Sequence, residues 1–269
     1  KRSIMKQVMF TLAALLNAFV LSACSINIGA DRSSGRYERD AAGYGASDGV
    51  VERSLSVQSF TKFECRLPVA VTYVQTNDQA PKVVLKGAPA MVERCVVDVR
   101  DGKLLLRLAQ NTEQNRKRFS KSRDKLKITV YGGQLTSLEM MTACSFYASQ
   151  LEATQLSLAN SGASIINVGR LVAQQLTLSC SGASSTRLGG SVGKLTMSIT
   201  GAANLGAQDL VAQELKAEMK GSTLGKLAVQ GSAKVDVSGA SSLTLSGTAD
   251  LFTINCVGAS SVKAAALKA

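Results

Sequence analysis

Apolar and polar residues alternate with a period of two through most of the C-terminal half of the chain, and a short marker interrupts this alternation regularly. The marker is usually Gly-Ala-Ser, and its glycine returns at intervals of 18 to 20 residues, as Gly162, Gly182, Gly201, Gly221, Gly239 and Gly258. The residues six, four and two positions before each glycine are mostly apolar, for example Leu195, Met197 and Ile199. A period of two that stays in phase over six repeats predicts strands that bury the same face in every repeat.

A repeat of about nineteen residues predicts a coil of three short strands, with the marker glycine at one corner. Glycine suits a corner because a sharp turn can require a positive φ, and because the next coil leaves no room for a side chain. A second inward strand follows the corner, and a third, weaker one passes through Leu171, Val192 and Leu210. The second strand contributes Ile166, Val168, Leu188, Leu243 and Leu245.

An earlier, degenerate copy of the repeat precedes the six regular ones. We expect Leu138, Met140 and Thr142 to be its inward residues, and Cys144 to stand where the glycine should be. Stacked coils pair in parallel about 4.8 Å apart, and right-handed crossovers are the default. The sequence therefore predicts an all-β protein in which residues 136–269 form a right-handed parallel β-helix of about seven rungs of ~19 residues.

Residues 50–135 read as a β-rich lead or cap region. Short strands are expected at 55–63, 68–75, 82–86, 95–100, 104–108 and 126–131, and Asp101-Gly102 is a turn pair that suits a tight hairpin. A cap of this kind is needed because an open end of the stack would expose core residues and unpaired strand edges.

The N-terminus has the pattern of a secretory signal: Lys1, Arg2 and Lys6 precede an apolar run over 8–21 that is too short to span a membrane. The run ends in Leu21-Ser22-Ala23-Cys24, which resembles the bacterial lipobox. This resemblance implies that residues 1–23 are removed and that Cys24 becomes the lipid-bearing first residue. Ser25 favours the outer membrane, with the leaflet, periplasmic or surface-facing, left open. Residues 24–49 read as a flexible tether rich in small and polar residues.

Composition excludes several kinds of chemistry. The chain has no histidine, so it has no Ser-His-Asp or Cys-His catalytic arrangement and no histidine-ligated zinc site. The glycine-rich segments lack the aspartate spacing of calcium-binding β-roll repeats, so no metal and no cofactor are expected.

The formal charge of +12 includes a dense basic stretch between two strand-like runs. A solvated hairpin loop is the favoured interpretation, and the alternative is a site for phosphate-rich surfaces such as lipopolysaccharide or anionic lipid. Nucleic acid is not an expected partner because no interleaved aromatic residues or recognised module accompany the charge. The basic residues are Arg116, Lys117, Arg118, Lys121, Arg123, Lys125 and Lys127.

Five cysteines remain besides Cys24. Cys180 and Cys256 occupy the same inward position four rungs apart, too far to bond to each other, and are expected to be small core residues. Cys65 and Cys95 both lie in strand-like runs, and whether they form a disulfide is left open.

The repeats contain few groups that could carry out chemistry. Glu218 and Asp236 share an outward register beside lysines, and alternating charge on a solvent face is favoured over a catalytic pair. Asn160 points inward and is expected to satisfy backbone groups. A flat hydroxyl patch that could bind water or glycans consists of Thr177, Ser179, Thr196 and Ser198.

Taken together, the Gly-Ala-Ser rungs, the Leu-x-Leu runs between them, the Asp101-Gly102-Lys103-Leu104 turn and the lipoprotein signal resemble the bacterial head-GIN-domain family, described as auto-transporter adhesins. The resemblance covers about 51–262. It implies a right-handed β-helix of the cell envelope and supplies no catalytic residues.

We therefore expect a lipid-anchored protein of the outer membrane that acts as a non-catalytic adhesion, binding or scaffolding module. Its expected partners are the membrane, through the lipid, and envelope glycans or host matrix. One alternative is a polysaccharide-active lyase or hydrolase that uses Asp236 and Glu218. Another is an envelope structural protein that self-associates into a homo-oligomer through the open C-terminal end.

Overall fold

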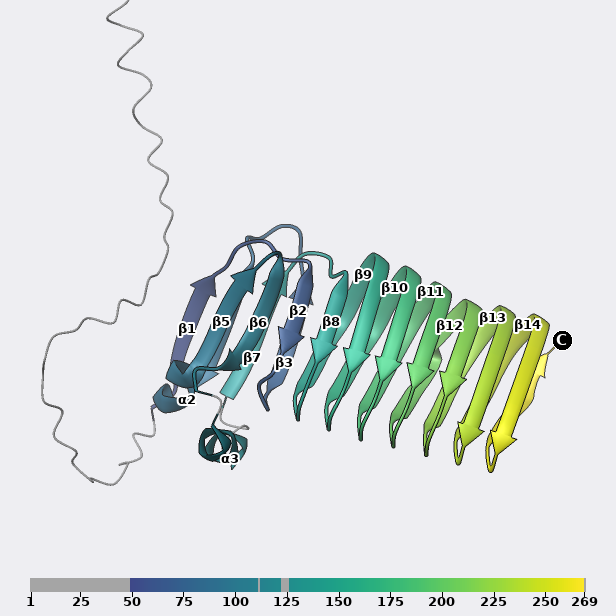
Figure 1. The fold of residues 1–269 in the computed structure, drawn as a ribbon. Coiled ribbons are helices and arrows are strands. Elements are labelled where there is room, and N and C mark those ends of the chain that lie inside the picture. Colours follow the sequence, from purple (N-terminus) through teal and green to yellow (C-terminus); the bar gives the residue numbers. More distant parts are fainter. Residues whose placement is uncertain (1–48, 111, 122–125, 269) are drawn as a thin grey trace, which may run out of the picture. The chain divides into compact units, whose positions relative to one another are not determined.

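The computed structural model describes residues 49–110, 112–121 and 126–268, which belong to one compact unit (Figure 1). Its fifteen described strands are hydrogen-bonded into one continuous sheet that coils along the stack. Within the described residues, no helix is long and apolar enough to cross a membrane. The elements are β1 (Val51–Ser56), β2 (Lys62–Cys65), β3 (Ala70–Gln75), β4 (Lys82–Gly87), α2 (Pro89–Arg94), β5 (Cys95–Arg100), β6 (Lys103–Leu108), α3 (Glu113–Lys121), β7 (Leu126–Gly132), β8 (Ser137–Met140), β9 (Ser145–Asn160), β10 (Ile165–Cys180), β11 (Ser185–Ile199), β12 (Asn204–Met219), β13 (Leu224–Gly239), β14 (Ser242–Gly258) and β15 (Ser261–Lys268).

The repeats form the predicted parallel β-helix. Each of β9–β14 makes one turn of the coil, with partial turns from β8 and β15, and successive strands pair in parallel. Equivalent inward residues lie in single file and are at most 2% exposed: Leu158, Leu178, Met197, Ala217 and Val235. The inward residues predicted for the other two walls are buried as well. The period-two pattern thus marks one shared interior.

Each turn is one long strand rather than the three short strands expected from the repeat length. The chain stays extended through two of its bends, and register shifts such as those between Val168 and Leu171 and between Gly231 and Ser232 absorb the change of direction. Only the marker corner interrupts the strand.

The six marker glycines all occupy this corner with φ between 71° and 97°. A Cβ at any of them would lie 2.6–3.2 Å from the carbonyl oxygen of the residue at the preceding corner. Both the backbone conformation and the close stacking of corners therefore require glycine.

The degenerate first copy is displaced by two residues from the predicted register. Leu138 pairs with Leu158 and Met140 with Asn160, so Thr142, not Cys144, takes the glycine position, with a φ of 73°. Cys144 instead lies beside Ser164, the next residue but one after the corner. The prediction that Cys144 takes the glycine position was wrong because a β-branched residue is very rarely found in the left-handed region, so nothing in the sequence indicated that Thr142 forms the corner.

The lead region is interleaved with the repeats. β2 pairs in parallel with both β6 and β8, and β3 with both β7 and β9, so the segment from β2 to β3 lies between strands that follow it in sequence. Phe63 stands between Leu104 and Leu138 in the same inward file. One core therefore runs from the lead region into the repeats.

The far end of the lead region is covered. The antiparallel strands β1, β4 and β5 lie there, and α2 packs against all three, burying Met91 and Val92. The predicted strand over 55–63 is in fact the end of β1 and the start of β2, with an irregular link between them. The Asp101-Gly102 hairpin between β5 and β6 is confirmed, with positive φ at both residues.

A buried carboxylate lies on β2. Glu64 is 3% exposed, and it accepts hydrogen bonds from Arg66 Nε and, at 3.0 Å, from Lys103 Nζ. Burial opposes ionisation of this carboxyl, but the hydrogen bonds from Lys103 and Arg66, with their charges, outweigh burial and lower the pKa of Glu64.

The five described cysteines are free thiols, so Cys65 and Cys95 form no disulfide. Cys180 is buried as expected, whereas Cys256 is exposed despite its inward position. The prediction for Cys256 was wrong because no further strand covers the part of β14 on which it lies.

Candidate functional site: a basic wall of the solenoid

One wall of the solenoid consists of β4, β7 and β3 followed by the first part of each strand from β9 to β15. We call it the basic wall. Parallel pairing places one outward residue of each strand in a single row, in the order Thr72, Tyr147, Asn167, Arg187, Gly206, Lys226, Thr244 and Lys263. The alternate residues on the same strands, such as Ile166 and Leu188, point into the core. The row therefore follows the long axis of the stack on a regular sheet surface.

Charge on the basic wall is of one sign. Its strand segments contain no aspartate or glutamate, while they carry Lys82, Lys86, Lys127, Arg187, Lys226 and Lys263. The carboxylates of the repeats all lie on the two other walls, at Glu139, Glu152, Asp209, Glu214, Glu218, Asp236 and Asp250. The sequence thus keeps carboxylates out of this phase of the repeat, whereas the other walls carry charges of both signs.

Three cations of the row are free to bind a partner. Arg187, Lys226 and Lys263 are exposed, and none of them forms an ion pair or hydrogen bond with another described residue. Some other lysines are engaged: Lys86, on β4 of the same wall, lies 3.2 Å from Glu52 on β1, and Lys194 lies 3.8 Å from Glu214 on another wall. A row of unpaired cations on an ordered sheet is the arrangement that attracts a polyanion.

The spacing of these cations is regular. Gly206 separates Arg187 from Lys226, and Thr244 separates Lys226 from Lys263, so neighbouring cations stand two strands apart. At about 4.8 Å between strands, this is about 10 Å. Toward the lead region the row continues with Asn167 and Tyr147, whose ring is 40% exposed.

The first part of the predicted basic stretch, up to Lys121, is a helix rather than a loop. Thr112 caps α3, because its Oγ1 accepts a hydrogen bond from the backbone N–H of Asn115 at 3.3 Å, and Phe119 is fully buried. Lys117 pairs with Glu113 one turn away at 2.8 Å. Good helix formers around one buried aromatic residue explain the difference.

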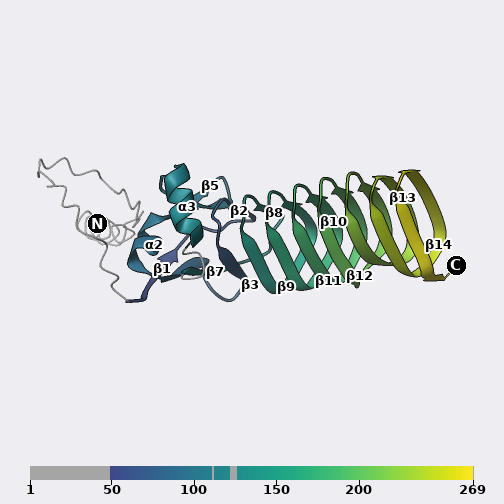
Figure 2. The same cartoon turned by 90° about the horizontal axis from the view of Figure 1, so that it is seen from below.

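The members of that stretch fall in different places. Arg116, Lys117, Arg118 and Lys121 lie on α3, and Lys127 is the second residue of β7 on the basic wall, where it is exposed. Arg123 and Lys125 lie outside the described residues, as does Cys24. Figure 2 shows α3 at the same end as α2 and β1, away from β14.

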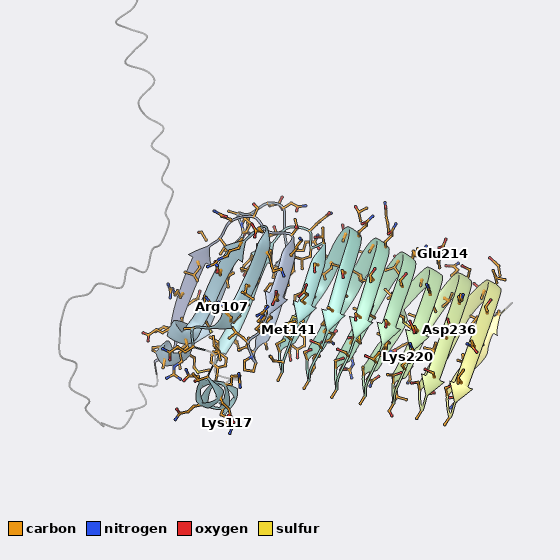
Figure 3. The ribbon with its side chains drawn as sticks, viewed as in Figure 1. Arg107, Lys117, Met141, Glu214, Lys220 and Asp236 are labelled. Carbon is orange, nitrogen blue, oxygen red and sulfur yellow. The ribbon has the colours of Figure 1, made fainter. Side chains whose placement is uncertain are left out.

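The candidate catalytic pair is a set of neighbouring surface charges. Glu218 and Asp236 do pair in register on β12 and β13, and Lys216 pairs with Lys234 beside them. The ammonium of Lys220 contacts Glu218, and its hydrogen bond and charge lower the pKa of that carboxyl. A carboxyl with a lowered pKa is a poor general acid at neutral pH. Figure 3 shows Lys220 and Asp236 on the exterior of the repeats.

Two other predicted features are where the sequence placed them. Thr177 pairs with Thr196 and Ser179 with Ser198 on one wall, so the hydroxyl patch exists, and Lys216 and Glu218 interrupt it on the next strand. Asn160 is buried, and its amide donates to the carbonyl of Ser185 at 2.9 Å and to Thr186 Oγ1 at 2.8 Å. It serves the packing of the first turns.

The row of cations was missed by the sequence reasoning, although a signal for it exists. Every residue of the row within the repeats stands five positions after a corner residue, as Arg187 does after Gly182 and Lys226 after Gly221. Sorting polar residues by their distance from the marker would have shown one wall with cations and no carboxylate, beside walls that carry both signs.

Three solved structures share this fold over 81% of the chain. They are a putative adhesin from Bacteroides fragilis (18% identity, TM-score 0.70, 97% of that chain covered), a putative adhesin from Parabacteroides merdae (14%, 0.63, 96%) and a putative lipid binding protein from Parabacteroides distasonis (14%, 0.54, 97%). None of the curated proteins compared with the chain matches it.

A family model described as "Putative auto-transporter adhesin, head GIN domain" matches residues 59–249. The match includes β2 to β13, the strands that carry both the interleaved lead region and most of the basic wall. Because it spans well over half of the chain, the protein belongs to the head GIN domain family.

Proposed function

We propose that this protein is a non-catalytic binding module of the bacterial cell envelope that holds acidic glycans on its basic wall. The observation that carries the proposal is the wall itself: Arg187, Lys226 and Lys263 are unpaired, evenly spaced and accompanied by no carboxylate on their strand segments. Membership of an adhesin family supports a binding role.

An extended, regularly charged chain fits this wall better than a compact ligand. The cations lie about 10 Å apart along the stack, which is close to the length of a disaccharide unit, so a polysaccharide with one acidic group per disaccharide can meet them in turn. Asn167 and the exposed ring of Tyr147 continue the row and offer an amide and an aromatic face to neutral parts of the sugar.

Each contact on such an open surface is weak. Exposed ion pairs contribute about 0.2–1 kcal/mol each, so three contacts raise the affinity by roughly three- to a hundred-and-fiftyfold, and salt weakens them. Useful adhesion then depends on many copies binding one polymer, which display on a membrane provides.

The same proposal includes an anchor. Acylation of Cys24 would fix the N-terminus in the outer membrane. Cells grown with radiolabelled palmitate should incorporate the label into the full-length protein, and Cys24→Ser should abolish the incorporation. An unlabelled protein in the soluble fraction would contradict the anchor.

Binding is tested with a soluble form that begins at Gly49 and contains every buried core residue of the described structure. The triple change Arg187→Gln, Lys226→Gln and Lys263→Gln is expected to weaken binding to an immobilised polyuronate at least tenfold at low salt. The matched control changes Lys194, Lys216 and Lys234, on another wall, to Gln and removes the same charge; it is expected to lose less than threefold.

Two further ligands sharpen the result. A neutral polysaccharide of similar length tests whether charge is needed, and anionic lipid vesicles test a phosphate surface, since one structural neighbour is described as a lipid binding protein. Equal losses in the two triple variants, or equal binding of neutral and acidic polymers, would show that the wall is not the site. Stronger binding to vesicles than to polyuronate would replace glycan by lipid as the partner.

A further inference from the structure

A polar hollow opens on the surface where the lead region meets the repeats. It lies between the end of β3 and the part of β9 that leaves the basic wall, and its volume is about 250 Å³. Among the described residues only polar side chains line it, and none of them belongs to the row of cations. The lining residues are Gln75, Thr76, Asn77, Asp78, Gln150 and Glu152. We call this feature the polar hollow.

The polar hollow exists because β3 ends while its neighbour β9 continues. The side chain of Gln75, the last residue of β3, takes the place of a further strand: its Nε2 donates to the carbonyl of Glu152 at 2.9 Å, and its Oε1 accepts from the backbone N–H of Glu152 at 2.8 Å. The chain then turns away, with the N–H of Thr76 donating to the carbonyl of Gly132 at 2.8 Å. Hydrogen bonds within the protein therefore set the shape of the hollow before a ligand binds, which lowers the cost of binding.

The side chains at the rim of the hollow are available to a ligand. Those of Asn77, Asp78 and Gln150 are exposed, and they form no hydrogen bond or ion pair with another described residue. Glu152 is partly engaged, since one of its carboxylate oxygens lies 3.8 Å from Arg170. Amides both donate and accept hydrogen bonds, and carboxylates only accept them. This combination suits hydroxyl groups, because each hydroxyl also donates and accepts.

Charge separates the hollow from the row of cations. Two carboxylates and no cation are among its described lining residues, so a uronate or phosphate group that the row attracts would be repelled here. Beside the hollow, Val74 and Tyr147 are 37% and 40% exposed on the outer faces of β3 and β9. They offer an apolar surface to the C–H groups of a sugar ring. Pockets for drug-sized ligands measure about 300–1,000 Å³, so this smaller hollow has room for about one sugar residue.

We propose that the polar hollow binds a single neutral hexose residue, whose hydroxyls donate to Asp78 and exchange hydrogen bonds with the amides of Asn77 and Gln150. Tyr147 stands both in the row and beside the hollow. The hexose is therefore a branch or a chain end of the polymer that lies on the basic wall. This last step rests on the proposed function, whereas binding of the hexose itself does not.

Binding of the hexose is tested by nuclear magnetic resonance on the soluble form that begins at Gly49. The probes are the methyl glycosides of glucose, galactose and mannose, and a ligand of this size is expected to bind with a dissociation constant of about 1–10 mM. At least one of them should shift the side-chain amide signals of Asn77 and Gln150. The single variants Asn77→Ala and Gln150→Ala identify these signals by their loss. Methyl glucuronide and methyl glucosaminide test the effect of charge and should bind more weakly than the best neutral glycoside.

A triple variant removes the three unpartnered groups of the rim. Changing Asn77, Asp78 and Gln150 to Ala should weaken binding of the methyl glycoside by roughly tenfold or more, because each lost hydrogen bond costs about two- to tenfold. The matched control removes two amides and one carboxylate at exposed positions on other walls and should bind as the parent does. It changes Gln155, Gln174 and Asp250 to Ala. Both variants should keep the parent's melting temperature, since none of the six side chains has a described partner.

The link to the basic wall is tested with a polyuronate that carries neutral hexose branches and with the same polymer after enzymatic removal of the branches. The parent protein should bind the branched polymer roughly threefold or more tightly than the debranched one. The rim variant should lose this preference and still bind the debranched polymer. The variant of Arg187, Lys226 and Lys263 should bind both polymers more weakly and keep the preference.

The two proposals fail in different ways. If the variant of the cations binds polyuronate like the parent while a methyl glycoside still shifts the amides of Asn77 and Gln150, the basic wall is wrong and the hollow stands. Three outcomes would overturn the hollow as a hexose site. These are no shift with any of the three neutral glycosides at ten times the expected dissociation constant, equal losses in the rim variant and its control, and tighter binding of the glucuronide or glucosaminide than of every neutral glycoside.

Discussion

Replacing the corner glycine Gly201 by alanine should destabilise the solenoid far more than the same change at Gly206, five residues later on β12. Gly201 has a φ of 83°, and an added Cβ would meet the carbonyl oxygen and the nitrogen of Gly182 at 2.9 and 3.0 Å. Neither partner can rotate away, since both are backbone atoms of the preceding corner. The substitution must therefore shift two stacked corners.

The magnitude follows from two terms. An alanine in the left-handed region costs about 1–2 kcal/mol, and relieving the contact by moving packed backbone adds about 1–2 kcal/mol. Alanine also restricts the unfolded chain, which returns about 0.4–1 kcal/mol. The net loss in the free energy of unfolding should be about 1–3.5 kcal/mol.

Gly206 provides the control within the same strand-and-corner unit. It lies outside the left-handed region, and a Cβ there would have ordinary contacts, at 3.6 Å to Arg187 Cγ and 3.7 Å to Gln208 Oε1. Gly206→Ala should leave stability unchanged within about 0.5 kcal/mol or raise it slightly. Urea unfolding of the form beginning at Gly49, followed by far-ultraviolet circular dichroism, measures both variants.

Repeat proteins can unfold in parts, so hydrogen exchange should accompany the urea experiment. Gly201→Ala should accelerate exchange first at the amides of Ala202 and Ser222, which donate hydrogen bonds to the carbonyl oxygens of Gly182 and Gly201, while the lead region keeps its protection. If Gly201→Ala and Gly206→Ala shift the urea midpoint equally, the explanation of the marker by backbone conformation and close stacking is wrong.

Three further outcomes are expected. Thr142→Gly removes a β-branched residue from the left-handed region and should raise stability by about 1 kcal/mol in thermal melts, whereas Thr136→Gly should lower it. In the form beginning at Gly49, a thiol reagent should modify Cys256 alone under native conditions and all five cysteines in denaturant, because burial keeps the others inaccessible and raises the pKa of Cys95 to about 12. The lowered pKa of Glu64 means that its stabilising effect is complete above pH ~4.5 and is lost as the pH falls through its folded-state pKa; Glu64→Gln should flatten the acid limb of a pH–stability curve, and an unchanged limb would contradict the assigned ion pairs.

Much of the fold could be predicted because the interior of a stacked coil repeats in the sequence. Leu178, Met197 and Val235 recur in phase since each fills the same place in the next turn, and the glycines recur since the corners touch. Period and backbone sterics are local signals. They also predicted the tight turn at Asp101-Gly102.

The lead region could not be predicted in the same way. β2 lies between β6 and β8, where its apolar residues Phe63 and Cys65 continue the inward row of both neighbours. The repeats in the sequence do not show which strands β2 pairs with. Thr142 was missed because a strained residue does not resemble the glycine whose place it takes. The helix α3 was missed because a segment with many charges and a single large apolar residue has no helical hydrophobic period. Phe119, which is fully buried, anchors this helix to the rest of the protein.

The placement of charge on the solenoid explains why the basic wall can remain empty of counter-charges. In a parallel stack every outward residue has a neighbour about 4.8 Å above and below, so like charges on adjacent strands repel strongly. On the other walls opposite charges relieve part of this repulsion, as between Lys194 and Glu214, although Glu218 stands against Asp236 and Lys216 against Lys234.

On the basic wall, relief comes from the neutral residues Gly206 and Thr244 that separate the cations. At about 10 Å in water, two unit charges repel by only about 0.4 kcal/mol before screening, and physiological salt screens most of that. The wall thus costs the folded protein little while unoccupied, yet a polyanion laid along the row meets all of its cations together. A design for stability alone would have no reason to exclude carboxylates from this phase of the repeat and to space its cations evenly, whereas a surface that binds an extended acidic polymer requires both.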